Sequence, residues 1–398
     1  MHPPRSAFCH VGLLNTHPVQ YYAPWYKALA QEIHLEVFYC HRQTAGGQAQ
    51  AGFGVEFEWD VPLLEGYRYH FLDNHSRSPN VSTFAGCDTP EIREIIAQSR
   101  FDAFIVHGWY VKSFWQAMLA CWQTGVPLLV RGDSQLNTAR SLPRRWMKYL
   151  LYRSFIPRFD GYLVVGERSR QYYLHYGADP ERMFFVPHSV DNEFFSNRTT
   201  QLRAMRDQLR LTFNLPADAL VFLFAGKLIP KKRPQDFIRG IALASRNTTN
   251  LYGLVVGDGP LRSELEEVVK QQSLPVRFAG FLNQTEMPNA YAASDVLVLP
   301  SDGGETWGLV VNEAMASGLP AIVSDQVGCG PDLVAPGKTG YVFACGNVSE
   351  LADIFTSLLQ NRSAIARLSD NAHNRIRQYS IDWAVQGTVE ALGAVMRQ

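Results

Sequence analysis

Short apolar runs alternate with amphipathic stretches along most of the 398-residue chain. Runs without polar interruption are typical of strands that are buried on both faces of a parallel sheet. The stretches between them have the spacing of helices. In the first half the runs cover residues 8–14, 35–39, 101–106, 127–130 and 161–165, and in the second half residues 220–225, 252–256, 276–279, 296–299 and 321–323. This alternation predicts parallel sheets covered by helices.

A polar stretch at residues 192–215 has little strand pattern and separates the two sets of runs. A chain of this length suits two domains of roughly 150–200 residues each. We predict two doubly wound, Rossmann-like α/β domains, an N-terminal one at 1–190 and a C-terminal one at 191–380. The ligand site of such a pair is expected in a central cleft that both domains face. Residues 381–398 are predicted to form a helix that packs back on the first domain.

Composition and charge narrow the class of protein. Hydrophobic residues make up 46% of the chain and charged residues 19%, which is typical of globular proteins. The 37 basic and 37 acidic residues cancel, so net charge gives no reason to expect nucleic-acid binding. The six cysteines include no Cys-x-x-Cys pair, and reduced thiols are expected. No signal peptide or membrane-spanning run is evident, which predicts a cytoplasmic protein.

Two carboxylates follow the apolar run at 296–299. They are the ends of Glu305-Thr-Trp-Gly-Leu-Val-Val-Asn-Glu313. Glu305 is expected in the loop after a strand, and Glu313 one or two turns into the next helix, so both side chains can face the same edge of the sheet. Open α/β sheets bind ligands at that edge. The pattern indicates a site for a phosphorylated, hydroxyl-rich ligand.

A basic loop follows the first strand of the second domain, in Phe-Ala-Gly226-Lys227-Leu-Ile-Pro-Lys-Lys232-Arg233. Lys227 and Lys232 lie at the same sheet edge as the glutamates and are candidates for binding a diphosphate. A solvated basic turn is the alternative for this loop alone, and the nearby glutamates favour the binding function. The sequence has no nucleotide-binding phosphate loop, no His-Glu-x-x-His and no Asp-x-Asp. We therefore expect no metal and no cofactor.

The segment Gly257-Asp258-Gly259 resembles part of a dinucleotide-binding fingerprint, but its third glycine is missing. A structural turn between strand and helix is the favoured interpretation, and an NAD-dependent dehydrogenase is disfavoured. In the first domain, His17 and His107 each follow a strand, as do Arg131 and Asp133.

Residues 143–153, Pro-Arg-Arg-Trp-Met-Lys-Tyr-Leu-Leu-Tyr-Arg, mix cations with bulky apolar side chains on a predicted helix. Contact with an anionic membrane is one interpretation. A surface helix that packs its apolar stripe on the core is the alternative and is slightly favoured.

Taken together, these motifs resemble the retaining glycosyltransferases of the GT-B fold, family 4, also called glycosyl transferases group 1. The resemblance is dense in the second domain and at Val-Pro-His-Ser-Val-Asp191, and thin in the first domain. Lys227 stands where the family has an arginine. The resemblance implies catalytic roles for Glu305, Lys227, Lys232 and His107. It implies donor contacts from Glu313, Gly308, Leu309, Gly226, Gly257, Phe281 and Leu282, and we assign acceptor contacts to His17, Gln20, Tyr21, Trp109, Arg131 and Asp133.

The resemblance also implies an activity. The expected reaction moves a sugar from a UDP- or GDP-sugar to a glycan or lipid-linked acceptor, with retention of anomeric configuration and without a metal. Glu305 would contact the sugar and Glu313 the ribose, while the lysines and the helix start at Gly308 stabilise the leaving diphosphate. Two alternatives stay open: a nucleotide-sugar epimerase, and a catalytically silent protein that binds sugar nucleotides.

Overall fold

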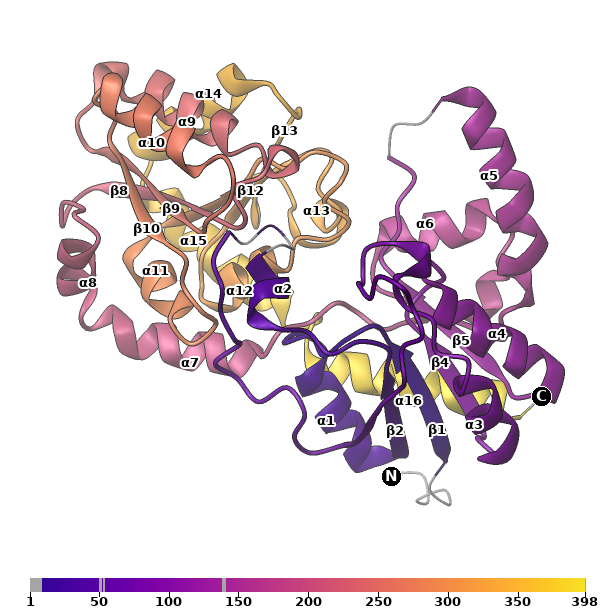
Figure 1. Ribbon diagram of the computed structural model, residues 1–398. Helices are drawn as coiled ribbons and strands as arrows, with labels where there is room; N and C mark the ends of the chain where they lie inside the picture. The colour runs from indigo at the N-terminus through magenta and orange to yellow at the C-terminus, as the bar shows by residue number, and fades with distance from the viewer. Residues whose placement is uncertain (1–8, 50–51, 53, 138–140, 398) are drawn as a thin grey trace. The chain divides into compact units, whose positions relative to one another are not determined.

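The computed structural model describes residues 9–49, 52, 54–137 and 141–397 (Figure 1). Within that part, the chain forms two compact units. The first contains the chain up to Gln43, Pro62–His188 and the chain from Ile381 onward, and the second contains Thr44–Val61 and Ser189–Ser380. The main boundaries therefore fall at 188/189 and 380/381, close to the predicted 190/191 and 380/381. The short segment 44–61 groups with the second unit, which the sequence did not suggest.

The first unit is built on a seven-stranded parallel sheet, counted over the described residues, in the order β3-β2-β1-β4-β5-β6-β7. Its strands are β1 (His10–Asn15), β2 (His34–Tyr39), β3 (Arg68–Phe71), β4 (Ala103–Val106), β5 (Leu128–Gly132), β6 (Gly161–Val164) and β7 (Met183–Phe185). Its helices are α1 (Ala23–Glu32), α3 (Ile92–Gln98), α4 (Lys112–Thr124), α5 (Leu142–Phe155), α6 (Glu167–His175) and α16 (Ile381–Val395).

Both faces of this sheet are buried, which explains why its central strands read as unbroken apolar runs. Successive side chains of β4 alternate between two cores, with Phe104 and Val106 in one and Ala103 and Ile105 in the other. Helix α16 contributes Ala384, Ala391 and Leu392 to the second core and contacts α1, β6 and β7 (Figure 1). The C-terminal helix thus packs back on the first unit.

The second unit is built on a six-stranded parallel sheet, again counted over the described residues, in the order β10-β9-β8-β11-β12-β13. Its strands are β8 (Leu220–Ala225), β9 (Leu251–Val256), β10 (Val276–Gly280), β11 (Val296–Leu299), β12 (Ala321–Ser324) and β13 (Gly340–Phe343). Its helices are α2 (Ala45–Gln48), α7 (Asn192–Arg203), α8 (Arg206–Thr212), α9 (Pro234–Ala244), α10 (Arg262–Gln271), α11 (Met287–Ala293), α12 (Leu309–Ala316), α13 (Gly330–Leu333), α14 (Val348–Gln360) and α15 (Ser363–Ile376).

All ten strands predicted from the sequence are present, and three others were missed: β3, β7 and β13. Each of the three lies at the edge of its sheet. Edge strands carry mixed side chains because one flank is open, and the side chains of Arg68, Tyr69 and His70 in β3 are indeed exposed. In the described part of the chain, no helix is long and apolar enough to cross a membrane.

Candidate active site

The order of strands in the second sheet brings two loops together. Strands β8 and β11 are neighbours at the centre, yet the chain continues from β8 to β9 on one side and from β11 to β12 on the other. Such a switch point is where open parallel sheets bind ligands, beyond the carboxyl ends of the strands. The loop after β8 carries Lys227 and Lys232, and the loop after β11 carries Glu305. The sequence-predicted cations and the first glutamate therefore meet at the switch point.

The contact between these loops is an ion pair. Lys232 Nζ pairs with Glu305 Oε2, and Ser301 Oγ donates a hydrogen bond of 3.2 Å to the same oxygen. Glu305 is only 9% exposed. Its backbone is also held, since the amide of Gly328 donates to Glu305 O at 2.9 Å. The carboxylate is therefore fixed in position and matched to a cation before any ligand arrives.

Lys227 lies in a more electropositive setting. Burial, followed by the neighbouring charges of Lys232 and Lys231, lowers the pKa of Lys227 to about 8, and Glu305 only partly offsets this. A cation held near other cations has excess positive charge that an anionic ligand can neutralise. The local electrostatics thus favour a polyanion such as a diphosphate next to Lys227.

Glu313 is buried in the second turn of α12, with 4% of its surface exposed. Tyr291 Oη, from α11, donates a hydrogen bond of 2.5 Å to Glu313 Oε2. Helix α12 begins after Gly308, which has a positive φ of 103° that favours glycine. The amides at Gly308 and Leu309 therefore open a helix N-terminus, which attracts anions.

The two glycines of Gly257-Asp258-Gly259 serve the packing of the β8 and β9 loops. A Cβ on Gly257 would collide with the carbonyl oxygen of Gly226, and one on Gly259 would press on the backbone of Leu228. Asp258 is engaged in an ion pair of 2.5 Å with Arg262 and accepts the amide of Gly259 at 2.7 Å. The glycines thus allow close backbone approach, and the acidic residue is held by an arginine of the same turn.

A segment that the sequence did not connect with this site lies close to it. Phe57 contacts Phe281 with ring centroids 4.4 Å apart, Asn283 Nδ2 donates to Glu58 O at 2.7 Å, and Gly52 lies near the Lys227 side chain. The neighbouring Leu282 is half-buried. Gly52, Phe57 and Glu58 therefore border the loops that follow β8 and β10. Their position depends on long-range pairing, for which no local sequence signal exists.

In the first unit, the predicted residues gather at the β1–β4 switch point, since β1 and β4 are central neighbours with crossovers in opposite directions. His107 follows β4 and is 8% exposed, with Nε2 lying 3.1 Å from Tyr26 Oη. Burial, and after it the charge of Arg131, lowers the pKa of His107 well below its ordinary value. His107 is therefore neutral at physiological pH and acts as a hydrogen-bonding group, not as a cation.

Arg131 and Asp133, at the end of β5, meet a residue that the sequence argument left out of the site. Arg131 Nη2 lies 3.4 Å from His188 Nδ1 and donates to Pro187 O at 3.2 Å, and Asp133 lies 3.8 Å from His188 Nε2. The Arg131 guanidinium also lies over the Trp25 ring, 4.8 Å from its centroid. The available signal for His188 was its place in Val-Pro-His-Ser-Val-Asp191, next to a boundary between two sets of strands.

The other acceptor candidates occupy different environments. The Trp109 ring packs among the aromatic rings of the first unit's core, including Phe155 at 5.4 Å and Tyr172 at 6.4 Å. Gln20 is 8% exposed, whereas His17 and Tyr21 are half-buried, and His17 Nδ1 lies 3.0 Å from Thr16 Oγ1. Trp109 is half-buried as well, so Gln20 is the buried one among these four side chains.

Two other features of the structure resemble ligand sites. Among the described residues, His10, His34 and Glu36 have metal-ligand spacing, but the two imidazoles are stacked at 15° and Arg68 Nη1 lies 3.0 Å from His34 Nε2. Parallel rings do not direct their lone pairs at one ion.

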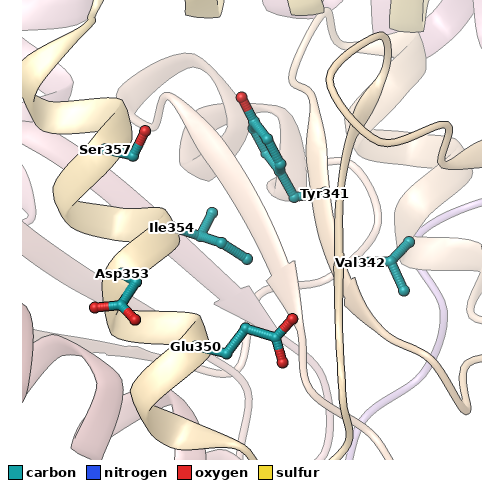
Figure 2. Close-up of a pocket in the computed structure, with 6 residues that line it drawn as sticks. All are labelled: Tyr341, Val342, Glu350, Asp353, Ile354 and Ser357. Carbon is teal, nitrogen blue, oxygen red and sulfur yellow. The ribbon is translucent and has the colours of Figure 1, made fainter.

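Figure 2 shows a pocket lined by α14 and β13, with Glu350, Asp353 and Tyr341. Glu350 accepts the Ala344 amide at 2.9 Å and thereby helps to form the start of α14.

The family follows from two matches that together cover most of the chain. The model described as glycosyl transferases group 1 matches residues 205–375, and the model described as glycosyltransferase family 4 matches residues 17–194. The two parallel sheets with their helices match the fold of GT-B glycosyltransferase structures. The chain belongs to the group 1, family 4 glycosyltransferases, as the sequence motifs predicted.

Individual relatives agree with this assignment. The D-inositol 3-phosphate glycosyltransferase of Thermomonospora curvata is 32% identical over 237 residues, which cover 57% of this chain and 54% of that protein. The chain spans about half the length of the curated relatives it matches. A glycosyltransferase from Rickettsia africae has a TM-score of 0.74 at 15% identity, covering 98% of this chain and 99% of that one. Anabaena HepE, solved with UDP and glucose, has a TM-score of 0.68 at 17% identity, covering 97% and 99%.

Proposed function

We propose that this protein is a retaining glycosyltransferase that moves a sugar from a UDP- or GDP-sugar to a glycan or lipid-linked acceptor, without a metal. The observation that carries the proposal is the Lys232–Glu305 ion pair beside Lys227 at the β8–β11 switch point. It combines charge for a diphosphate with a fixed carboxylate for sugar hydroxyls. The complex of Anabaena HepE with UDP and glucose supports a nucleotide sugar as donor.

The cations and helix α12 would stabilise the leaving group. Breaking the bond between the anomeric carbon and the diphosphate oxygen leaves negative charge on the nucleotide and an oxocarbenium-like sugar. Lys227, Lys232 and the amides of Gly308 and Leu309 are the groups assigned to that charge. Losing one preorganised donor of this kind costs about 3 kcal/mol of transition-state stabilisation. In this proposal, Lys227 and Lys232 neutralise the charge of the diphosphate in place of a metal ion.

The glutamates position the substrate in this proposal. Glu305 exchanges its ion pair with Lys232 for the hydroxyls of the donor sugar, which frees Lys232 for the phosphate. Glu313, held by Tyr291, binds the ribose. Neutral His107 contributes a hydrogen bond to the donor sugar. Neither glutamate attacks the anomeric carbon: the departing phosphate oxygen takes the proton of the acceptor hydroxyl, whose oxygen then bonds to the same face of the sugar. The product keeps the anomeric configuration.

A lipid-linked acceptor would place the reaction at the cytoplasmic face of a membrane, with residues 143–153 in contact with it. A glycan acceptor would need no such contact. The acceptor is assigned to the first unit, where His17, Gln20, Tyr21 and the Arg131–Asp133 segment follow β1 and β5.

A donor-turnover assay tests the proposal. The protein is incubated with a panel of UDP- and GDP-sugars in EDTA, and release of nucleotide diphosphate is measured for wild type, Glu305→Gln and the control Glu264→Gln, whose side chain is exposed on α10. The proposal predicts equal release by wild type and the control, and release roughly a hundredfold slower by Glu305→Gln. An epimerised nucleotide sugar would favour an epimerase, and binding without turnover of any donor or acceptor would favour a silent binding protein.

A further inference from the structure

Helix α5 has two apolar faces, and only one of them is covered. Tyr149, Tyr152 and Phe155 turn toward the first unit, where Tyr152 and Phe155 pack near Trp109. The opposite face carries five large apolar side chains that are 55–69% exposed: Leu142, Trp146, Met147, Leu150 and Leu151. We call these five residues the α5 apolar face. The expectation that this helix buries its apolar stripe on the core is therefore only half correct.

The exposed face is a continuous stripe and not a scatter of single residues. At about 100° per residue, Leu142, Trp146 and Leu150 fall on successive turns of one side, with Met147 and Leu151 beside them. The amino-terminal half of α5 extends away from the sheet of its unit (Figure 1). An apolar stripe with a tryptophan on a projecting helix is unusual for a surface that faces water alone.

The charge around the stripe is of one sign. Between Asp133 and Asp160 the sequence has no acidic residue, and it has six cations: Arg140, Arg144, Arg145, Lys148, Arg153 and Arg158. By helical rotation, Arg144 and Arg153 lie at the two margins of the stripe. Beneath the helix, burial and then Arg145, Lys148 and Arg153 lower the pKa of His175.

The covered face fixes the helix firmly enough to present the stripe. Lys148 Nζ lies over the rings of Tyr152 and Tyr172, 4.8 Å from each centroid. Arg153 Nη1 donates to Tyr149 Oη at 3.0 Å. These contacts leave Arg144, Arg145 and the margin of the stripe available to a partner.

We propose that the α5 apolar face is a docking surface for an anionic lipid bilayer. The apolar side chains enter the boundary between headgroups and acyl chains, Trp146 lies at the level of the headgroups, and the flanking arginines contact lipid phosphates. An interfacial helix of this kind lies in the plane of the membrane and does not cross it. A protein partner would need acidic groups opposite every flanking cation, whereas an anionic bilayer supplies them at any orientation.

Vesicle flotation tests the docking surface without measuring sugar transfer, so its outcome is independent of the proposed reaction. Wild type is expected to float with vesicles of phosphatidylcholine and phosphatidylglycerol in equal parts, to bind phosphatidylcholine alone weakly, and to be released by high salt. Trp146→Gln with Leu150→Gln should lose flotation. Arg144→Gln with Arg145→Gln should lower the partition coefficient about 25-fold, given roughly a factor of five per cation.

Matched controls come from the second unit. The control for the apolar variant is Leu211→Gln, at a leucine of α8 that is 76% exposed. The control for the arginine variant is Arg198→Gln with Arg239→Gln, at two exposed arginines. Both controls should float as wild type does. Circular dichroism melting verifies that every variant is folded. Equal flotation of the α5 variants and wild type, or no flotation of folded wild type, would overturn the proposal. A dimer in sedimentation that Trp146→Gln dissociates, with no lipid binding, would instead assign the face to a second copy of the chain.

Discussion

Lys232 and Glu305 form an ion pair across 73 residues of sequence, because β8 and β11 are neighbours at the centre of the second sheet. The pair joins the two loops at the switch point before a ligand is present. Its carboxylate is also held by Ser301, so the geometry does not rely on a flexible lysine alone. A donor that displaces this pair gains a cation for its phosphate and a carboxylate for its sugar.

Replacing Glu305 should reduce turnover more than donor binding. Glu305→Gln keeps the size of the side chain and removes its charge, and we expect kcat to fall roughly 10²-fold because a transition-state contact is lost. The KM for the donor should change only a few-fold, since Lys232 becomes free for the phosphate. Steady-state kinetics separate the two constants. A large rise in KM with unchanged kcat would assign Glu305 to ground-state binding instead.

Donor affinity should depend on pH through Lys227. Its pKa is lowered to about 8, so the free protein loses this charge as the pH rises through that value. A bound diphosphate favours the charged lysine, and affinity should therefore fall above about pH 8, by up to roughly tenfold per pH unit. Calorimetric titration with UDP and GDP at several pH values measures this. Lys227→Arg, which stays charged, should remove the dependence.

Lys227 should also lower the free energy of unfolding of the ligand-free protein. Because the folded pKa is depressed, the unfolded chain binds more protons between about pH 8 and the ordinary lysine value of 10.5, and stability rises with pH in that window. Below about pH 8, Lys227 is charged in both the folded and the unfolded state, and its charge then destabilises the folded state by the full amount. Lys227→Met should then raise the melting temperature at neutral pH by roughly 2–4 °C, corresponding to about 1 kcal/mol after allowance for solvent screening. A lower melting temperature would contradict the electrostatic account.

Gly257 should be intolerant of any side chain. Gly257→Ala places a methyl group against the Gly226 carbonyl in a backbone with φ of 127°, and we expect a loss of more than about 3 kcal/mol or failure to fold. Gly125→Ala is the matched control, since its φ is also positive at 76° but nothing lies within 4 Å. The control should lose only about 1 kcal/mol in chemical denaturation. Equal losses of unfolding free energy in the two variants would show that the positive φ alone, and not the close approach of the Gly226 carbonyl, requires glycine at position 257.

Removing the hydroxyl of Tyr291 should weaken binding of the nucleotide more than it slows the transfer step. Tyr291→Phe deletes the hydrogen bond to buried Glu313, which costs about 1–3 kcal/mol of stability and leaves the carboxylate free to turn. We expect KM to rise and kcat to stay within a few-fold of wild type. Both kinetics and urea denaturation check this. Unchanged KM with lowered stability would restrict Tyr291 to a structural role.

The sequence predicted the central parts of the fold because buried strands carry their own signal. Strands β8 and β11 are almost wholly apolar, and the residues that follow them were assigned to one sheet edge without knowledge of the strand order. What could not be predicted depends on pairing across the chain. The Phe57–Phe281 contact, the meeting of Arg131 with His188 and the exposure of the α5 apolar face each require knowing which surfaces are covered.

The central claim is that the cations at the β8–β11 switch point bind the diphosphate of a nucleotide sugar. Isothermal titration of UDP and GDP, in EDTA, tests it most directly on wild type and on Lys227→Ala with Lys232→Ala. The account predicts that wild type binds at least one of the two nucleotides and that the double variant, still folded by circular dichroism, binds it at least a hundredfold more weakly, since two charge-assisted contacts are lost. Equal binding by the folded double variant would contradict the claim.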